Sequence, residues 1–155
     1  FEPEITPTVP RPGVRRQGLS EDDAAANVRA VVESQALALK RHSAWMGVRV
    51  DTVHATGGAS ANREILRVLA DVFDAPVFQF QVSNSAALGA ALRAYHAHEL
   101  VGGRPIRWEA VISGFAEPIA ASRIDPFPEN VRLYRDMEQR HAEFEARELK
   151  SEAAS

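Results

Sequence analysis

Two adjacent glycines, Gly57 and Gly58, separate a short apolar run from a helical pattern, and residues of these types could bind an anion. The apolar run covers residues 53–56, and the helical pattern begins at Arg63. Glycine has no Cβ, so a ligand can approach its backbone closely, and the N–H groups at a helix start favour anions. The segment therefore predicts a phosphate or nucleotide contact. The alternative is a tight strand-to-helix turn that binds nothing.

No other cluster of residues predicts catalysis or metal binding. The five histidines lack metal-ligand spacing, and no nucleophile motif surrounds Ser60 or Ser85, which are typical turn or cap residues. We expect His54 to lie in a buried strand as a core histidine. The sequence thus predicts no catalytic residue and no metal ligand in this chain.

Two further groups of residues have structural interpretations. Asp71 and Asp74 follow the glycine turn on the helical segment, and we expect them to be solvated or to stop the helix. Trp45 and Trp108 are expected in the core rather than stacked on a ligand.

The composition is that of an ordinary globular protein. The chain has 155 residues, 45% apolar and 25% charged, and its net charge of −3 argues against nucleic-acid binding. It contains no cysteine, which excludes a disulfide scaffold and a thiolate site and permits a reducing compartment. Neither a membrane span nor a signal peptide is visible, so we expect a cytoplasmic protein. Because the chain begins at Phe1, we expect a fragment, a processed product or an ordered remnant.

The first part of the chain predicts an extended segment followed by a long helix. Residues 1–18 are rich in proline, which fixes φ and removes a hydrogen-bond donor. Ser20 is the predicted N-cap of the helix, with acidic residues in its first turn, and Gly47 is its predicted end. An apolar stripe runs along this helix through Val28, Val31, Val32, Gln35, Leu39 and His42.

The middle of the chain predicts a strand, a helix, a second strand and a second helix. The first strand ends at Thr56, and the helix after the glycines stops at Ala75-Pro76. A strand over 77–82 leads to a cap cluster at 83–85 and an alanine-rich helix over 86–100. Two strands joined by a helix predict a parallel crossover. This is a small α/β sheet whose edges need a cover.

The last third predicts helices joined by a loop. A short helix over 106–113 carries Trp108, and a proline-containing loop covers 114–128. A polar helix over 129–149 has an apolar stripe suited to packing on the body or on a partner, made of Val131, Tyr134, Met137, His141 and Phe144.

Three segments together resemble one known family. Residues 55–77, from Ala-Thr-Gly-Gly-Ala-Ser-Ala-Asn to the Asp-Ala-Pro helix stop, resemble the nucleotide segment in the second domain of the FGGY carbohydrate kinases. Residues 84–94 resemble the next helix of that domain, and residues 29–36 resemble an earlier one. The order and spacing agree over roughly residues 4–98, and the similarity is greatest to the xylulokinases.

This resemblance implies the fold and the ligand. It implies part of the actin-like, ribonuclease H-like ATPase fold, namely the C-terminal lobe of a sugar kinase that holds ATP between two domains. By position, Gly57, Gly58 and Ala59 would approach the phosphates through their backbone, and Asn62 would reach the adenosine. The Mg²⁺ that accompanies ATP would be held mainly by the N-terminal domain, which also supplies the catalytic aspartate and most sugar contacts.

The family's Asp-x-Gly-Thr hairpin does not occur in this chain, so we expect it to be inactive alone. The resulting division is an extended segment over 1–19, a nucleotide-side α/β core over 20–104 and a helical extension over 105–155. The implied function is the nucleotide-binding part of a kinase that phosphorylates a ketopentose such as D-xylulose.

Two alternatives and a question of assembly stay open. The first alternative is a non-catalytic nucleotide-binding or scaffold domain of actin-like fold. The second is a dinucleotide-binding unit, which is disfavoured because no Gly-x-Gly-x-x-Gly motif opens the helix. An isolated half would expose the apolar face that packs on its missing domain, which leaves a homodimer open.

Overall fold

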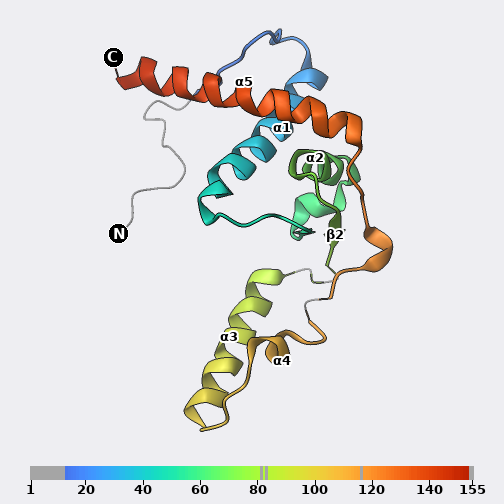
Figure 1. The fold of residues 1–155 in the computed structure, drawn as a ribbon, viewed down its shortest axis with the longest axis vertical. Coiled ribbons are helices and arrows are strands. Elements are labelled where there is room, and N and C mark those ends of the chain that lie inside the picture. Colours follow the sequence, from blue (N-terminus) through green and yellow to red (C-terminus); the bar gives the residue numbers. More distant parts are fainter. Residues whose placement is uncertain (1–12, 81, 83, 116, 154–155) are drawn as a thin grey trace. The chain divides into compact units, whose positions relative to one another are not determined.

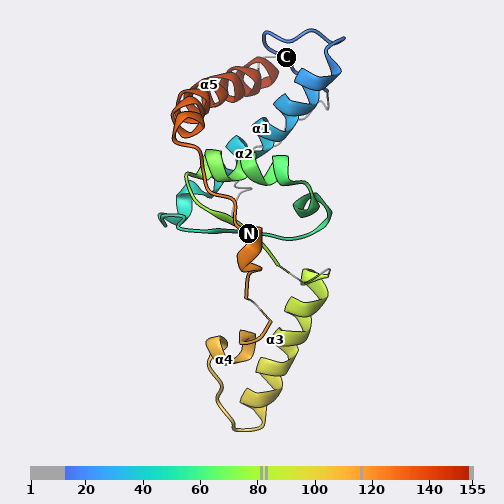
Figure 2. The ribbon, with the colours of Figure 1, turned by 90° about the vertical axis from the view of Figure 1, so that its right-hand side faces the viewer.

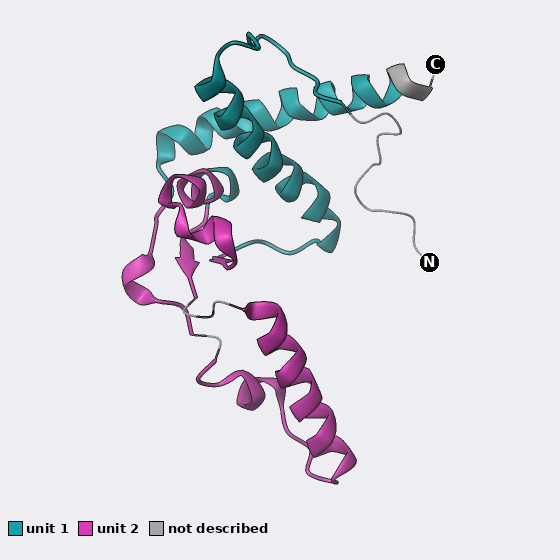
Figure 3. Ribbon diagram, turned by 180° about the vertical axis from the view of Figure 1, so that it is seen from behind, with its two compact units in different colours: residues 1–50, 71–74, 126–155 teal, residues 51–70, 75–125 magenta. Residues whose placement is uncertain are grey.

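The computed structural model describes residues 13–80, 82, 84–115 and 117–153. These form two compact units, shown in two colours in Figure 3. Unit 1 contains residues 1–50, 71–74 and 126–155, and unit 2 contains residues 51–70 and 75–125. The extended course predicted for residues 1–12 lies outside the described residues.

Unit 1 is built on helix α1, Ala24–Ser43, whose start differs from the prediction. Asp23, not Ser20, is the N-cap, and its carboxylate accepts a hydrogen bond from the Ala26 N–H at 2.9 Å. Ser20 instead accepts from the Asp22 N–H in a preceding turn, so the acidic cluster itself supplies the cap. A short 3-10 helix, η1 (Ala44–Met46), follows, and Gly47 ends it at φ 63°, as predicted.

The second helix of unit 1 is α5, Pro128–Ala153, and its start is fixed by a buried aspartate. Asp71 is fully buried, and its carboxylate accepts from the Phe127 N–H and from the Asn130 side chain, both at 2.7 Å. The expectation of a solvated Asp71 is therefore wrong. Asp74 does stop its helix, at φ 53°, and it pairs with Arg135 of α5 at 3.0 Å.

Helices α1 and α5 lie against each other (Figures 1 and 2). The apolar stripe predicted for α5 is confirmed, since Val131 and Tyr134 are buried and the rest of the stripe is half-buried. Most of the stripe predicted for α1 is not buried. Val28 is 67% exposed and Leu39 57% exposed. Val32 and His42 are half-buried, and His42 pairs with Glu145 of α5 at 2.9 Å.

Unit 2 contains the strand–helix–strand arrangement that the sequence predicts. Strands β1 (Val53–Ala55) and β2 (Val77–Gln79) are parallel, with Val53 opposite Val77, and helix α2 (Arg63–Phe73) joins them. One face of this sheet packs on α2. The core there consists of Ala55, Leu66, Ala70, Val77 and Ile124, with Val53 and Leu69 beside it.

His54 of β1, which the sequence predicted to be a core residue, lies on the side of the sheet opposite α2, next to two phenylalanines. His54 is exposed, not buried, because it points away from the face covered by α2. Its ring lies edge-on to the half-buried rings of Phe78 and Phe80, at centroid distances of 6.4 and 4.7 Å.

The segment predicted as a plain loop pairs with β2. Val77 and Ile124 exchange two backbone hydrogen bonds of 2.9 Å, and the Ile119 N–H donates to the Gln79 carbonyl at 2.8 Å. The buried Ser122 hydroxyl, in a 3-10 helix over Ala120–Ser122, accepts from the Gln79 N–H at 2.8 Å. This pairing covers the edge of β2.

Helices α3 (Ser85–Val101) and α4 (Trp108–Ile112) pack together in unit 2. Asn84 caps α3 by accepting from the Ala87 N–H, as the predicted cap cluster requires. The rings of His96 and Trp108 stack at 4.2 Å. Trp108 remains 40% exposed and Trp45 67% exposed, so neither is the core residue expected. Within the described residues, no helix combines the length and the apolarity needed to cross a membrane.

Candidate functional site

The glycine turn after β1 is open. Gly57 has φ 84°, in the region that favours glycine, and Gly58 begins a 3-10 helix, η2 (Gly58–Ala61). A Cβ built on either glycine would meet no atom within 4 Å. Ala59 and Asn62 are also exposed. The structure therefore brings all four predicted site residues to an accessible surface of unit 2.

The turn is held by residues that sequence analysis did not assign to it. The Ser60 hydroxyl donates to the Gly57 carbonyl at 2.7 Å, which confirms Ser60 as a turn residue. The Gln79 side-chain amide donates to the Ser60 carbonyl, and the Gln79 N–H donates to Ser122. Gln79 thus ties the turn to β2. Its polar side chain in an apolar run was the signal available in the sequence.

Asn62 is the residue that starts α2. Its side-chain oxygen accepts from the N–H groups of Glu64 at 2.9 Å and Ile65 at 3.4 Å, and its carbonyl accepts from Leu66. Three of the amides at the start of α2 are therefore satisfied by Asn62 itself. The side-chain nitrogen of Asn62 has no hydrogen-bond partner among the described residues, and the residue is exposed.

Two of the amides that remain for an anion belong to the turn. The N–H groups of Gly58 and Ala59 lie at the start of η2, where no intrahelical partner exists. Neither has a partner elsewhere in the part of the chain that the structure describes. We expected an anion at the start of the helix after the glycines. Asn62 satisfies three of the amides there, whereas both of these turn amides are without a partner in the described residues.

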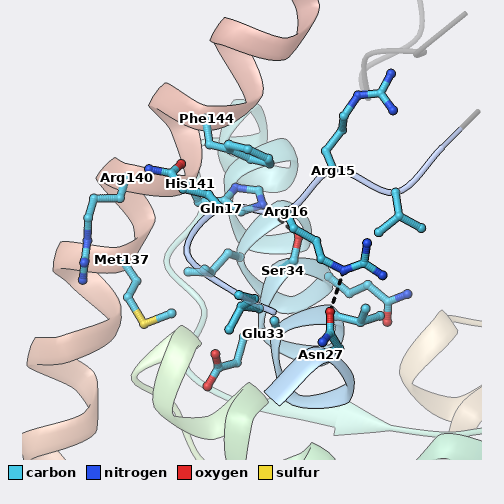
Figure 4. A pocket seen from close by; sticks show the side chains of 16 residues that line it. Arg15, Arg16, Gln17, Asn27, Glu33, Ser34, Met137, Arg140, His141 and Phe144 are labelled. Carbon is cyan, nitrogen blue, oxygen red and sulfur yellow. Dashed lines mark hydrogen bonds between the residues drawn. The ribbon is translucent and has the colours of Figure 1, made fainter. Parts of the chain in front are cut away.

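A separate cavity of about 600 Å³ lies in unit 1, between α1, α5 and residues 14–19 (Figure 4). None of the four predicted site residues lines it. Ser34 of α1 and His141 of α5 are joined in it at 3.1 Å, and burial lowers the pKa of His141. Arg16 at its edge donates to Asn27 at 2.7 Å and pairs with Glu21. Two pairs of its polar side chains bond to each other, and we assign the cavity no chemistry.

No metal site is evident in the described ranges. They contain no group of three or more His, Cys, Asp or Glu side chains placed to hold an ion.

The fold matches part of a solved structure. The crystal structure of xylulose kinase from Rhodospirillum rubrum superimposes with a TM-score of 0.66 at 22% sequence identity. The match covers 88% of this chain and 28% of that one. The chain is therefore an α/β unit of the actin-like ATPase fold.

The family follows from the sequence match. Residues 9–98 match the model of the C-terminal domain of the FGGY family of carbohydrate kinases, a range that includes the glycine turn. The chain belongs to this family.

Curated relatives agree with this assignment. Xylulose kinase of Rattus norvegicus is 39% identical over 125 residues, and that of Mus musculus is 35% identical over 152 residues. Xylulose kinase 2 of Arabidopsis thaliana is 42% identical over 86 residues, or 54% of this chain. The chain spans only 23%, 27% and 15% of these three proteins.

Proposed function

We propose that the chain is the C-terminal, nucleotide-binding portion of an ATP-dependent kinase that phosphorylates a ketopentose such as D-xylulose. The observation that carries the proposal is the open glycine turn inside the segment that matches the FGGY family. The rat and mouse relatives, both named xylulose kinases, support the choice of sugar. We also propose a cytoplasmic location.

The turn would bind the nucleotide through its backbone. The amides of Gly58 and Ala59 would donate to phosphate oxygens, and the missing Cβ at both glycines would allow a close approach. The free amide nitrogen of Asn62 would donate to the adenosine. Mg²⁺ would neutralise phosphate charge and would be held mainly by residues of a preceding domain.

Phosphoryl transfer needs groups beyond this chain. A sugar hydroxyl must be positioned in line with the γ-phosphate and must lose its proton to a base. We propose that a preceding domain supplies that base and the sugar contacts. Closure of the two domains on ATP would exclude water and limit wasteful hydrolysis.

The test is the protein made from the complete reading frame. We expect ADP release that depends on D-xylulose, with a sugar phosphate identified by mass spectrometry, and an Asp-x-Gly-Thr segment upstream of Phe1. Glycerol, gluconate and ribulose are tested in the same assay, and the compound that gives the greatest ADP release identifies the preferred substrate. A folded full-length protein that binds ATP but phosphorylates none of the four would favour the non-catalytic alternative.

A further inference from the structure

Helix α1 has its charged and apolar sides reversed relative to an ordinary surface helix. All four of its charged residues lie toward α5 or at the edge of that contact. Arg29 donates to Glu33 at 2.6 Å and to the Tyr134 hydroxyl at 2.8 Å. Lys40 pairs with Glu138 at 2.9 Å, and Arg41 pairs with Glu145 at 3.4 Å. The charges of α1 are thus used within unit 1.

The other side of α1 carries no charged residue and is largely exposed. It consists of Val28, Val31, Val32, Gln35 and Leu39, which we name the α1 stripe. Val32 is half-buried, and Val31 and Gln35 also line the cavity between α1, α5 and residues 14–19. Val28 is 67%, Val31 55% and Leu39 57% exposed. Trp45 and Met46, which follow directly in η1, are 67% and 48% exposed. A helix on a finished surface puts its charges outward and its apolar residues inward.

We infer that the α1 stripe is covered by the preceding part of the same polypeptide, the part that carries the proposed N-terminal domain. The inference rests on the proposed function, because it requires a longer chain. The length of the relatives supports this occupant: the matched chain is about a quarter of the rat and mouse proteins, so most of their residues have no counterpart here. A second copy of this chain is the competing occupant.

Thiol labelling of the full-length protein tests the inference. The chain has no cysteine, so Val28→Cys and Leu39→Cys each introduce one defined thiol into it, which peptide mapping separates from any upstream cysteine. Glu143→Cys, on an exposed position of α5, is the matched control. We expect both stripe thiols to react at least about tenfold more slowly in the native than in the denatured protein, since a covered thiol needs local opening.

Three outcomes overturn the inference. The first is labelling of both stripe thiols at the denatured rate in a dilute native monomer. The second is protection that appears only as sedimentation shows dimer formation, which assigns the stripe to a second copy. The third is a reading frame that contains no preceding domain. Should a cysteine variant fail to fold by circular dichroism, hydroxyl-radical footprinting of the unmodified protein reads the same side chains. Kinase activity is not the readout, so an inactive protein with protected thiols contradicts only the proposed function.

Discussion

At the scale of single residues, Asn62 combines a structural and a proposed binding role in one side chain. Its oxygen caps α2 at 2.9 Å from the Glu64 N–H, and its amide nitrogen has no hydrogen-bond partner among the described residues. The two roles use different atoms. A substitution can therefore remove one role and leave the other.

Asn62→Asp keeps a capping oxygen and removes the amide donor. Because aspartate caps as well as asparagine, we expect the unfolding free energy to change by less than about 0.5 kcal/mol. We expect ATP affinity of the full-length protein to fall by about tenfold, the worth of one lost hydrogen bond near added negative charge. Calorimetric titration with ATP and denaturant unfolding measure the two quantities separately.

Gly58→Ala tests, in the same calorimetric titration, whether the ATP phosphates approach the backbone of the turn. Gly58 is outside the left-handed region and a Cβ there meets no atom, so the fold should tolerate the methyl group while a phosphate would meet it. Gly89→Ala in α3 is the matched control, because a Cβ there also meets nothing. Unchanged ATP affinity in both Asn62→Asp and Gly58→Ala would remove the turn from the nucleotide site.

At the scale of elements, α1 and α5 are joined by a buried tyrosine. The Tyr134 hydroxyl donates to Glu33 at 2.8 Å and accepts from Arg29 at 2.8 Å, and its side chain is nearly inaccessible. Burial, aided by the hydrogen bond to Glu33, raises the pKa of Tyr134 from 10.0 to about 12. The folded protein therefore holds this proton more tightly than the unfolded chain does.

The raised pKa of Tyr134 predicts a loss of stability at high pH. The stabilisation is present below pH 10 and is lost as pH rises toward 12, because the unfolded chain ionises first. This rise in pKa corresponds to about 2–3 kcal/mol of unfolding free energy. Urea unfolding measured between pH 9 and pH 12 should show a loss of unfolding free energy of about this size.

Two variants make the origin of that loss clear. Tyr134→Phe should abolish this component of the pH dependence while other groups still titrate. In a Tyr95→Phe background Tyr134 is the last tyrosine of the chain, so tyrosinate absorbance reports its pKa directly. Ionisation at the ordinary tyrosine value in the folded state would contradict the buried hydrogen-bonded geometry.

The elements show which parts of the fold the sequence could predict. Local signals were sufficient for α2, β2 and α3, because Gly57, the Ala75-Pro76 stop and the Asn84 cap act on their own neighbours. Contacts distant in sequence were missed. Asp71 bonds to Phe127, 56 residues away, and Gln79 bonds to Ser122, 43 residues away. No spacing rule connects such pairs, so Asp71 was taken as solvated and residues 114–128 as a plain loop.

The candidate site was likewise predictable in part from the sequence. The open turn and its exposed residues followed from the glycine pair, whereas the use of the α2 amides by Asn62 could not be seen in the sequence. The α1 stripe is a different case. Its periodicity does indicate burial, but nothing in the described residues covers Val28 or Leu39. Periodicity reports that a face needs a partner and does not say whether the partner lies in the same 155 residues.

At the scale of the whole molecule, the proposed function gives the chain only part of the machinery that phosphoryl transfer requires. The chain matches the C-terminal domain of its family and spans about a quarter of the rat and mouse relatives. A kinase needs a positioned nucleophile, a base and charge compensation at the γ-phosphate. In the described residues the glycine turn offers two backbone amides and one side-chain amide, none of which can accept the sugar proton. The division at residues 19 and 104 stays a prediction.

The 155-residue chain alone should therefore bind ATP weakly and turn over no sugar. Two backbone amides at an exposed turn compete with water for phosphate, so their net contribution is about 1–3 kcal/mol, which corresponds to millimolar affinity or weaker. Adding the separately expressed preceding domain should tighten ATP binding and restore sugar-dependent ADP release, because the phosphates and the sugar hydroxyl would then be held together. A coupled assay with D-xylulose, run on each part and on the mixture, measures this. Pentulose-dependent turnover by the chain alone would mean that a base and a sugar site exist within these residues, and the assignment of both to another domain would be wrong.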